Sequence, residues 1–170
     1  YGNVDQGRDI VRYGAFDASL RTRQAGKIKM LCAHDTDRLC GVWTAVSSDT
    51  KGLFVRGKLL LTTELGRDTY EQIKAGALDA MSIGYRVMED EYDSAASVRT
   101  ITRADLLEVS LVAMPMNDQA LITSVKSLDI DGLETLSDAE RLLRDAGRSF
   151  SRKEALDFVS RVKRIAQREA

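Results

Sequence analysis

The chain has 170 residues, and its 25 Lys and Arg residues against 26 Asp and Glu residues leave a formal net charge of −1 at pH 7. This balance argues against nucleic-acid binding, which needs an excess of positive charge to neutralise phosphates. No run of about eighteen apolar residues is present to cross a membrane. Cys32 and Cys40 are too few for a disulfide framework, which suits a reducing cytoplasm.

Residues 1–126 are expected to form a β-rich domain, because short strand-like segments alternate there with Gly, Asp and Ser. Alternating or β-rich patterns predict strands at 27–34, 41–46, 52–61, 80–88, 97–103, 105–114 and 120–125. A helix is predicted at 67–75, where Gly76 can supply the C-terminal stop. The acidic residues 89–93 are expected to form a polar connection.

Residues 127–170 are expected to form a helical C-terminal extension. Two pairs in it have the spacing of capping boxes, namely Ser137 with Glu140 and Ser151 with Glu154. The first helix is predicted to end at Gly147, and the second to run towards the C-terminus with its apolar residues roughly on one side. Such a segment either packs on the β domain or docks a partner.

His34 is the only histidine of the chain, and it stands where a predicted strand gives way to a polar loop. A half-buried, reachable side chain there suits a general base. The alternative is a histidine that simply hydrogen-bonds the loop. A metal site formed with Cys32 and the nearby aspartates is a third interpretation. It lacks a paired Cys-x-x-Cys and a second histidine, so we expect no metal.

Ser82 lies in a predicted strand whose alternation gives it one small, polar face and one apolar face. Gly84 shares the polar face and removes a side chain where another chain could approach closely. The segment lacks the glycine pattern and the following helix of a nucleophile elbow. Ser82 is therefore either a nucleophile of another kind or a serine that only packs.

Glu108 and Ser110 alternate with apolar residues, so both lie on the face opposite to those residues. A carboxylate in such a run needs a partner, because burying an unpaired charge is costly. The candidates are His34 and one of three arginines, Arg86, Arg99 and Arg103. With His34 as the partner, Ser82, His34 and Glu108 supply the three roles of an acyl-transfer triad.

Short motifs occur in a fixed order through most of residues 7–125. They include Asp9-Ile10-Val11, Leu31-x-x-His34-Asp35, Gly41-x-Trp43, Ser82-Ile83-Gly84-Tyr85 and Leu107-Glu108-Val109-Ser110-Leu111-Val112. In this order they resemble the prohead maturation proteases of tailed bacteriophages. That family is similar in fold to the herpesvirus assemblins. The resemblance implies an α+β fold in which a mostly antiparallel β-barrel is surrounded by helices, followed here by C-terminal helices.

The resemblance also implies a function. Members of the family are serine endopeptidases that degrade the scaffold protein or trim the scaffolding segment of the major capsid protein, and that cleave themselves. By this resemblance Ser82 is the nucleophile, His34 the general base and Glu108 the third member, and no cofactor is needed. The expected partners are the scaffold protein and the major capsid protein, with neither nucleic acid nor membrane.

By the same resemblance, a homodimer is expected by analogy with assemblins, and the expected location is the host bacterial cytoplasm, inside the assembling procapsid. Family members normally have a further strand before the Asp-Ile-Val motif, and this chain starts at Tyr1, so we expect an N-terminal piece to be missing. The rival interpretation is a non-catalytic capsid-assembly or scaffold-binding module. In that module Glu108 pairs with an arginine, and Ser82 is merely small.

Overall fold

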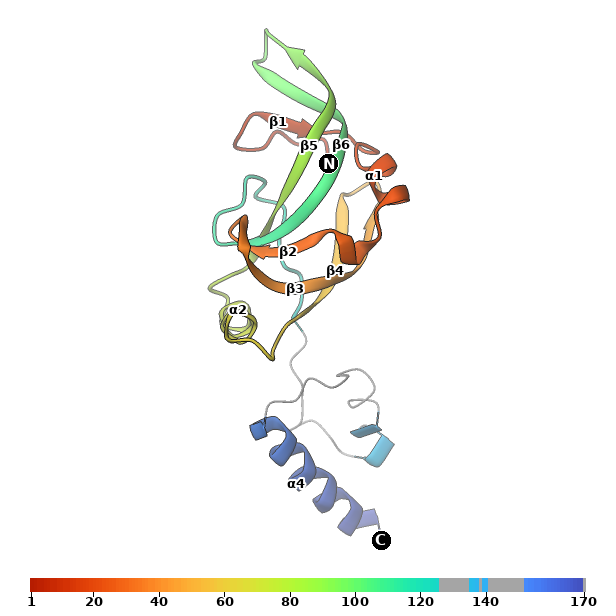
Figure 1. Cartoon of the computed structure of the whole chain (residues 1–170), viewed down its shortest axis with the longest axis vertical. Coiled ribbons are helices and arrows are strands. Elements are labelled where there is room, and N and C mark those ends of the chain that lie inside the picture. Colours follow the sequence, from red (N-terminus) through yellow and green to blue (C-terminus); the bar gives the residue numbers. More distant parts are fainter. Residues whose placement is uncertain (126–134, 138, 141–151, 170) are drawn as a thin grey trace. The chain divides into compact units, whose positions relative to one another are not determined.

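The computed structural model describes residues 1–125, 135–137, 139–140 and 152–169. The chain divides into two compact units, Tyr1–Thr123 and Ser124–Ala170. The first unit holds a curved, six-stranded sheet with two helices, α1 (Asp17–Thr22) and α2 (Glu64–Lys74), and a short 3-10 helix, η1 (Ala25–Lys27) (Figure 1). Within this unit the α+β prediction is confirmed.

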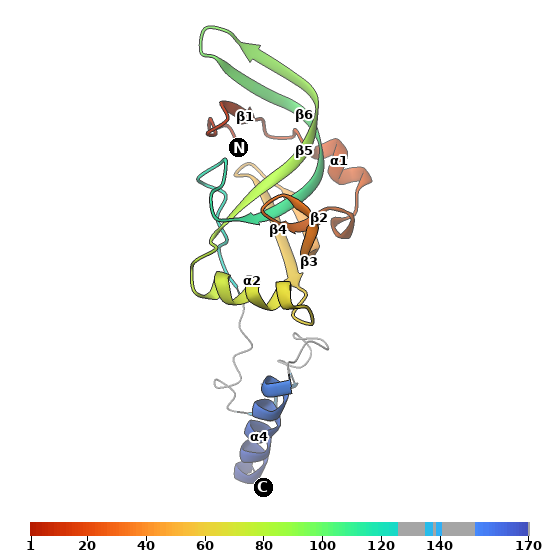
Figure 2. The ribbon, with the colours of Figure 1, turned by 60° about the vertical axis from the view of Figure 1, so that its left-hand side comes forward.

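The long strand β6 organises the sheet. The six strands are β1 (Asp9–Val11), β2 (Lys29–Cys32), β3 (Asp35–Ser48), β4 (Leu53–Leu59), β5 (Ala80–Asp93) and β6 (Val98–Val112). β5 pairs with β6 antiparallel along its length. On the other side of β6, β1 pairs with its first half and β2 with its second half, both in parallel. β3 and β4 then continue the sheet with antiparallel pairings, and both views show its strong curvature (Figures 1 and 2).

The predicted β-barrel is not present in the part of the chain that the structure describes, whereas the prediction that most strand pairings are antiparallel holds for three of the five pairings. The sheet is mixed, because two of the pairings of β6 are parallel. It is also open, since in the described part of the chain β4 has a strand partner on one side only. Alternation of side chains reports which face a residue occupies and carries no information on the direction of the neighbouring strand. The pattern therefore located the strands without fixing their pairing.

Helix α2 confirms the predicted helix and begins three residues earlier. Thr63 is its N-cap, and the Thr63 hydroxyl accepts a hydrogen bond from the Gly66 N–H at 3.1 Å. At the other end Gly76 has a φ of +73°, a left-handed conformation that glycine adopts without cost. The Gly76 N–H donates to the Ile73 carbonyl at 3.0 Å, so the helix ends there.

Three strands, β3, β5 and β6, are longer than predicted. The acidic residues 89–93, expected as a connection, belong to β5, and the two strands predicted at 97–103 and 105–114 form the single strand β6. Arginines on neighbouring segments pair with this acidic end, as in the Arg103–Glu89 contact at 2.7 Å. Such pairing lets charged residues occupy a strand. Residues 120–125, predicted as a strand, contribute only an isolated bridge between Ala80 and Leu121.

The side chains of the neighbouring strands β2 and β6 lie alternately on the two faces of the sheet. One face carries Met30 and Val109 and belongs to the hydrophobic core, which also contains Phe16, Ile28, Cys32, Cys40, Trp43, Leu78, Ile101, Ala104, Leu106 and Leu111. The opposite face carries Lys29, Glu108 and Ser110, because side chains alternate along each strand. We call it the outer face.

The second unit contains α4 (Arg152–Glu169), which confirms the helix predicted near the C-terminus. Ile165, on the predicted apolar side, is buried. The helix predicted from the first capping box falls mainly on residues 141–147, outside the described residues. None of the described helices has both the length and the apolar character needed to span a bilayer.

Candidate active site

His34 sits in a tight turn of two residues, Ala33 and His34, between β2 and β3. The two residues have φ values of 55° and 61°, although neither is glycine, asparagine or aspartate. This left-handed conformation suits a type I′ hairpin turn and is unfavourable for Ala and His. Two hydrogen bonds to β6 hold it, from the Ala33 N–H to the Leu111 carbonyl at 3.0 Å and from the His34 N–H to Ser110 Oγ at 3.1 Å. These hydrogen bonds therefore keep the strained turn in place and fix His34 over β6.

The His34 ring is bound to Glu108. Nδ1 of His34 lies 2.7 Å from Oε1 of Glu108, with side-chain exposures of 43% and 12%. A carboxylate only accepts hydrogen bonds, so Nδ1 carries the hydrogen, and Nε2 of the neutral ring keeps its lone pair. Of the two kinds of partner that the sequence leaves open for Glu108, the histidine is the one in contact. The ring is thus held at one nitrogen and available at the other.

Ser110 completes the support of Glu108. Its hydroxyl donates to Oε2 of Glu108 at 2.7 Å and accepts the His34 N–H, and the residue is fully buried. The donor and one of the two acceptor positions of this hydroxyl therefore position the carboxylate and the turn. Strand alternation predicts that Ser110 lies on the same face as Glu108, but no function was predicted for Ser110. Its spacing of two residues from Glu108 on one strand was the available signal.

Gly84 makes room for the Glu108 carboxylate. The two residues face each other across β5 and β6, and a Cβ at Gly84 would overlap Oε1 of Glu108 and lie 2.8 Å from its Cγ and Cδ. The sequence suggested that this space would admit a substrate backbone. Glu108 fills it instead, so the glycine is needed for the position of the carboxylate.

Ser82 lies on β5 directly opposite Ser110, on the outer face, and is 8% exposed. Side chains at such opposed positions have Cβ atoms about 4.5–5.5 Å apart. Within the described residues the Ser82 hydroxyl makes no hydrogen bond, and none joins it to His34. The only buried side-chain polar atom without a partner in that part of the chain is Nε of Arg23, so Oγ of Ser82 keeps contact with solvent. The structure brings His34 and Glu108 together and leaves Ser82 on the adjoining strand.

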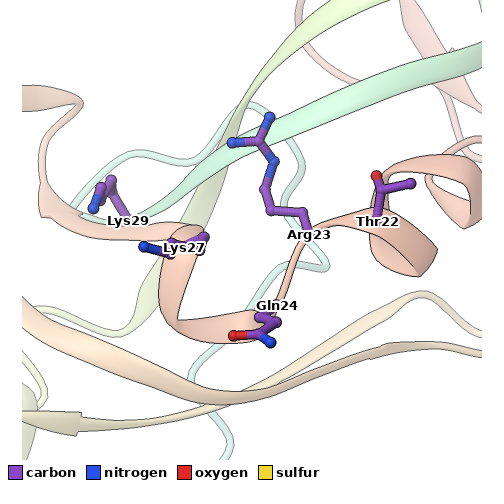
Figure 3. A pocket seen from close by; sticks show the side chains of 5 residues that line it. All are labelled: Thr22, Arg23, Gln24, Lys27 and Lys29. Atoms are coloured by element: carbon purple, nitrogen blue, oxygen red, sulfur yellow. The ribbon is translucent and has the colours of Figure 1, made fainter.

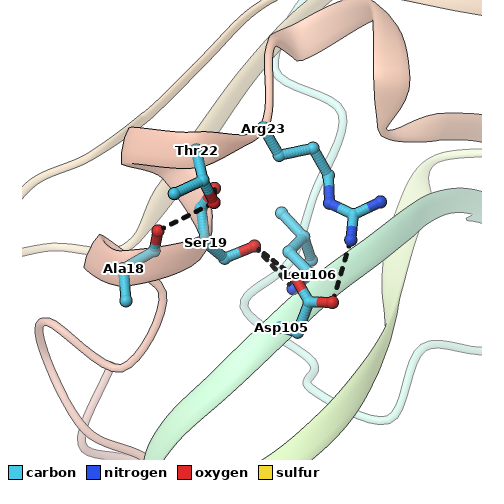
Figure 4. Close-up of polar contacts among 6 residues, drawn as sticks. All are labelled: Ala18, Ser19, Thr22, Arg23, Asp105 and Leu106. Atoms are coloured by element: carbon cyan, nitrogen blue, oxygen red, sulfur yellow. Dashed lines mark hydrogen bonds and ion pairs between the residues drawn. The ribbon is translucent and has the colours of Figure 1, made fainter.

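Helix α1 is anchored to β6 three residues before Glu108. Ser19 Oγ donates to the Asp105 carboxylate at 2.9 Å and accepts the Leu106 N–H at 3.0 Å, and Arg23 donates to Asp105 at 2.8 Å (Figure 4). The Ser19 hydrogen bond, aided by Arg23, lowers the pKa of Asp105. Asp105 therefore stays ionised and holds the segment between α1 and β2 beside the candidate site.

The cysteines next to the turn lie in the core. Cys32 and Cys40 are buried free thiols, and Cys32 Sγ lies 3.4 Å from the Thr69 hydroxyl. Burial, with the nearby Cys32 thiol, raises the pKa of Cys40 to about 12, which keeps its thiol neutral and a poor metal ligand. The described residues contain no group of three His, Cys, Asp or Glu side chains placed to hold a metal ion.

A serine, a histidine and a carboxylate on one face of a sheet are the side chains with which serine hydrolases perform acyl transfer. Comparison with known proteins gives the class directly. A family model described as Caudovirus prohead serine protease matches residues 1–133. The chain therefore belongs to the Caudovirus prohead serine protease family, and the resemblance seen in its motifs is confirmed.

Individual phage proteins are similar over different shares of the chain. The chain is 33% identical to the prohead protease of Enterobacteria phage HK97, over 100% of the chain and 75% of that protein. It is 26% identical to the prohead protease of Escherichia phage T5, over 74% of the chain and 59% of that protein. A capsid polyprotein of Pseudomonas phage PAJU2 is 31% identical over 60% of the chain, which corresponds to 16% of the polyprotein.

Proposed function

We propose that the chain is a serine endopeptidase of prohead maturation in which Ser82 is the nucleophile, His34 the general base and Glu108 the residue that orients His34. The observation that carries this proposal is the 2.7 Å contact between Nδ1 of His34 and Glu108, which leaves Nε2 available. Family membership supports the reaction class.

In the proposed reaction, Oγ of Ser82 attacks the carbonyl carbon of the scissile peptide bond while Nε2 of His34 takes the hydroxyl proton. The tetrahedral intermediate collapses, the imidazolium gives the proton to the leaving amine, and an acyl-serine forms. A water molecule, deprotonated by His34 in the same way, then attacks the acyl-serine and releases the carboxylic acid product and free Ser82. Glu108 stabilises the imidazolium, which forms twice in each cycle. General-base assistance of this kind contributes about 10²–10⁴-fold in rate.

The proton transfer requires the Ser82 hydroxyl to come within about 2.6–3.2 Å of Nε2 of His34. The hydroxyl makes no hydrogen bond among the described residues, so rotation about its Cα–Cβ bond toward the histidine breaks no existing interaction. Ser110 is a poorer nucleophile, since its hydroxyl is fully buried and already donates to Glu108. The two serines therefore differ in availability although they face each other.

The proposed substrates are the scaffold protein or the scaffolding segment of the major capsid protein, together with the protease itself, cut inside the assembling procapsid. A similar segment within a protein described as a capsid polyprotein supports a target in the capsid. A non-catalytic assembly module would pair Glu108 with an arginine, whereas Glu108 contacts His34.

Co-expression with the scaffold and major capsid proteins tests the proposal. Ser82→Ala should abolish scaffold cleavage and self-cleavage while circular dichroism and the melting temperature stay unchanged. Ser110→Ala is the matched control: it removes a hydroxyl at the opposed position and should slow cleavage without abolishing it. Cleavage by the Ser82→Ala variant at the wild-type rate would refute the proposed mechanism.

A further inference from the structure

A hollow of about 620 Å³ lies around the segment that joins α1 to β2. Figure 3 shows the side chains that line it, Thr22, Arg23, Gln24, Lys27 and Lys29. Three of these five residues are cationic and none is acidic. We call it the cationic hollow.

The positive charge of the cationic hollow is largely uncompensated. Arg23 contacts Asp105 at 2.8 Å. Lys27 and Lys29 are exposed and make no ion pair within the part of the chain that the structure describes. The whole chain is slightly acidic, with a net charge of −1, so these cations are a local concentration. Such a surface attracts an anionic group and repels a cationic one.

Strand register connects the cationic hollow with the candidate site. Lys29 is the residue of β2 that faces Glu108 of β6, and Leu31 faces Ser110, which in turn faces Ser82. Lys29 and Glu108 lie on the same outer face, on strands about 4.8 Å apart. The Glu108 carboxylate is occupied by His34 and Ser110. Among the described residues it makes no ion pair with Lys29.

The register also gives a distance along the sheet. Lys29 stands two residues before the level of Ser82 and Ser110, or about 7 Å at the rise of a strand. Asp105, which holds Arg23, stands five residues before Ser110, or about 17 Å. A substrate chain in extended conformation rises about 3.3 Å per residue. Lys29 is also two strands away from Ser82, about 9.6 Å across the sheet, so the combined separation is about 12 Å. Substrate side chains two to five residues from the bond at Ser82, whose own length adds to this reach, would therefore contact the cationic hollow if the substrate crosses the sheet obliquely.

We propose that the cationic hollow is a subsite for an acidic side chain of the polypeptide substrate, two to five residues from the scissile bond. This inference rests on the proposed function, because it takes Ser82 as the point of cleavage. Lys27 and Lys29 bind the carboxylate, and Arg23 contributes the donors that Asp105 leaves free. The subsite selects substrates by charge and takes no part in the proton transfers at His34.

Binding of an acidic peptide tests the cationic hollow without catalysis. Fluorescein-labelled hexaglutamate is titrated with the full chain at about 50 mM salt, where charge attraction is weakly screened. Lys27→Gln with Lys29→Gln should weaken binding roughly tenfold, as expected for two exposed ion pairs. Lys51→Gln with Lys74→Gln removes the same charge elsewhere and should bind like the wild type. Equal binding by the two double variants, or none by the wild type, overturns the subsite.

Cleavage of a proteome-derived peptide library separates this inference from the proposed function. The wild type should enrich Asp and Glu at one or more positions two to five residues from the cut, and the Lys27→Gln, Lys29→Gln variant should lose this enrichment. Labelling of Ser82 by a fluorophosphonate should be the same in both proteins. Labelling with no acidic preference overturns the subsite alone. Absence of labelling at Ser82 overturns the proposed function, and the hexaglutamate titration still decides whether the hollow binds acidic chains.

Discussion

Replacing Gly84 with alanine should disconnect Glu108 from His34 while the fold persists. The new Cβ would overlap Oε1 of Glu108 and lie 2.8 Å from its Cγ and Cδ, about 0.6 Å inside the 3.4 Å at which ordinary contact begins. The carboxylate sits at the end of a flexible side chain, so it moves more readily than the backbone of β5 or β6. Its movement breaks the 2.7 Å contact with His34.

The displacement of the carboxylate should lower both the stability of the fold and the rate of the reaction. A hydrogen bond to a charged group contributes about 1.5–3 kcal/mol, so the Gly84→Ala variant loses modest stability. Loss of an oriented base lowers the rate far more, by about 10²–10⁴-fold. Gly52→Ala is the matched control, because a Cβ at Gly52 meets no atom within 4 Å. It should keep the wild-type rate.

The assay has two readouts, the rate of fluorophosphonate labelling and the imidazole signals in nitrogen-15 NMR spectra. His34 is the only histidine, so these signals come from one ring. The wild type should show hydrogen on Nδ1, and Gly84→Ala should show a mixture of tautomers with slow labelling. A Gly84→Ala protein that labels at the wild-type rate, with unchanged imidazole signals, would refute the reasoning.

Three further variants test separate parts of the structure. Glu108→Gln removes the charge behind His34 and should slow labelling about 10²–10⁴-fold with little change in melting temperature; a wild-type rate would contradict the role of Glu108. The folded-state pKa of Asp105 is lowered, so its ionised form stabilises the fold above the unfolded value of about 3.9, and this contribution is lost as pH falls through the folded value. Asp105→Asn should therefore melt below the wild type at pH 7, with a gap that closes under acid conditions; a gap independent of pH would exclude this linkage. Gly66→Ala places a Cβ 2.5 Å from a backbone carbonyl carbon of the preceding loop, and overpacking of about 1–3 kcal/mol should lower the melting temperature by roughly 2–12 °C. Gly52→Ala should leave it unchanged, and equal melting of the two glycine variants would contradict the packing argument.

The sequence predicted part of the arrangement of side chains at the candidate site. The requirement that a carboxylate in an apolar strand have a partner left His34 as one candidate for Glu108, and the structure shows that contact. Alternation put Ser82 and Gly84 on one face, and the register of β5 with β6 shows why: they oppose Ser110 and Glu108. Both inferences depend on local spacing, which the strand period fixes.

Features that depend on contacts between residues far apart in the sequence were not predicted. The Ala33-His34 turn lacks the glycine or asparagine that usually marks a left-handed turn, because its strain is balanced by hydrogen bonds to β6. The parallel pairing of β2 with β6 joins segments that are far apart in the sequence, and side-chain alternation carries no information on it. The cationic hollow has no periodic signal, since Lys27 and Lys29 converge with Arg23 only through the loop that carries them.

The central claim is that His34, held by Glu108, activates Ser82. Mapping the fluorophosphonate adduct by mass spectrometry of the wild type and of His34→Ala tests it most directly. A single adduct on Ser82 that disappears in His34→Ala is the predicted result. An adduct on Ser110 or another residue, or equal labelling of Ser82 without the histidine, would contradict the claim.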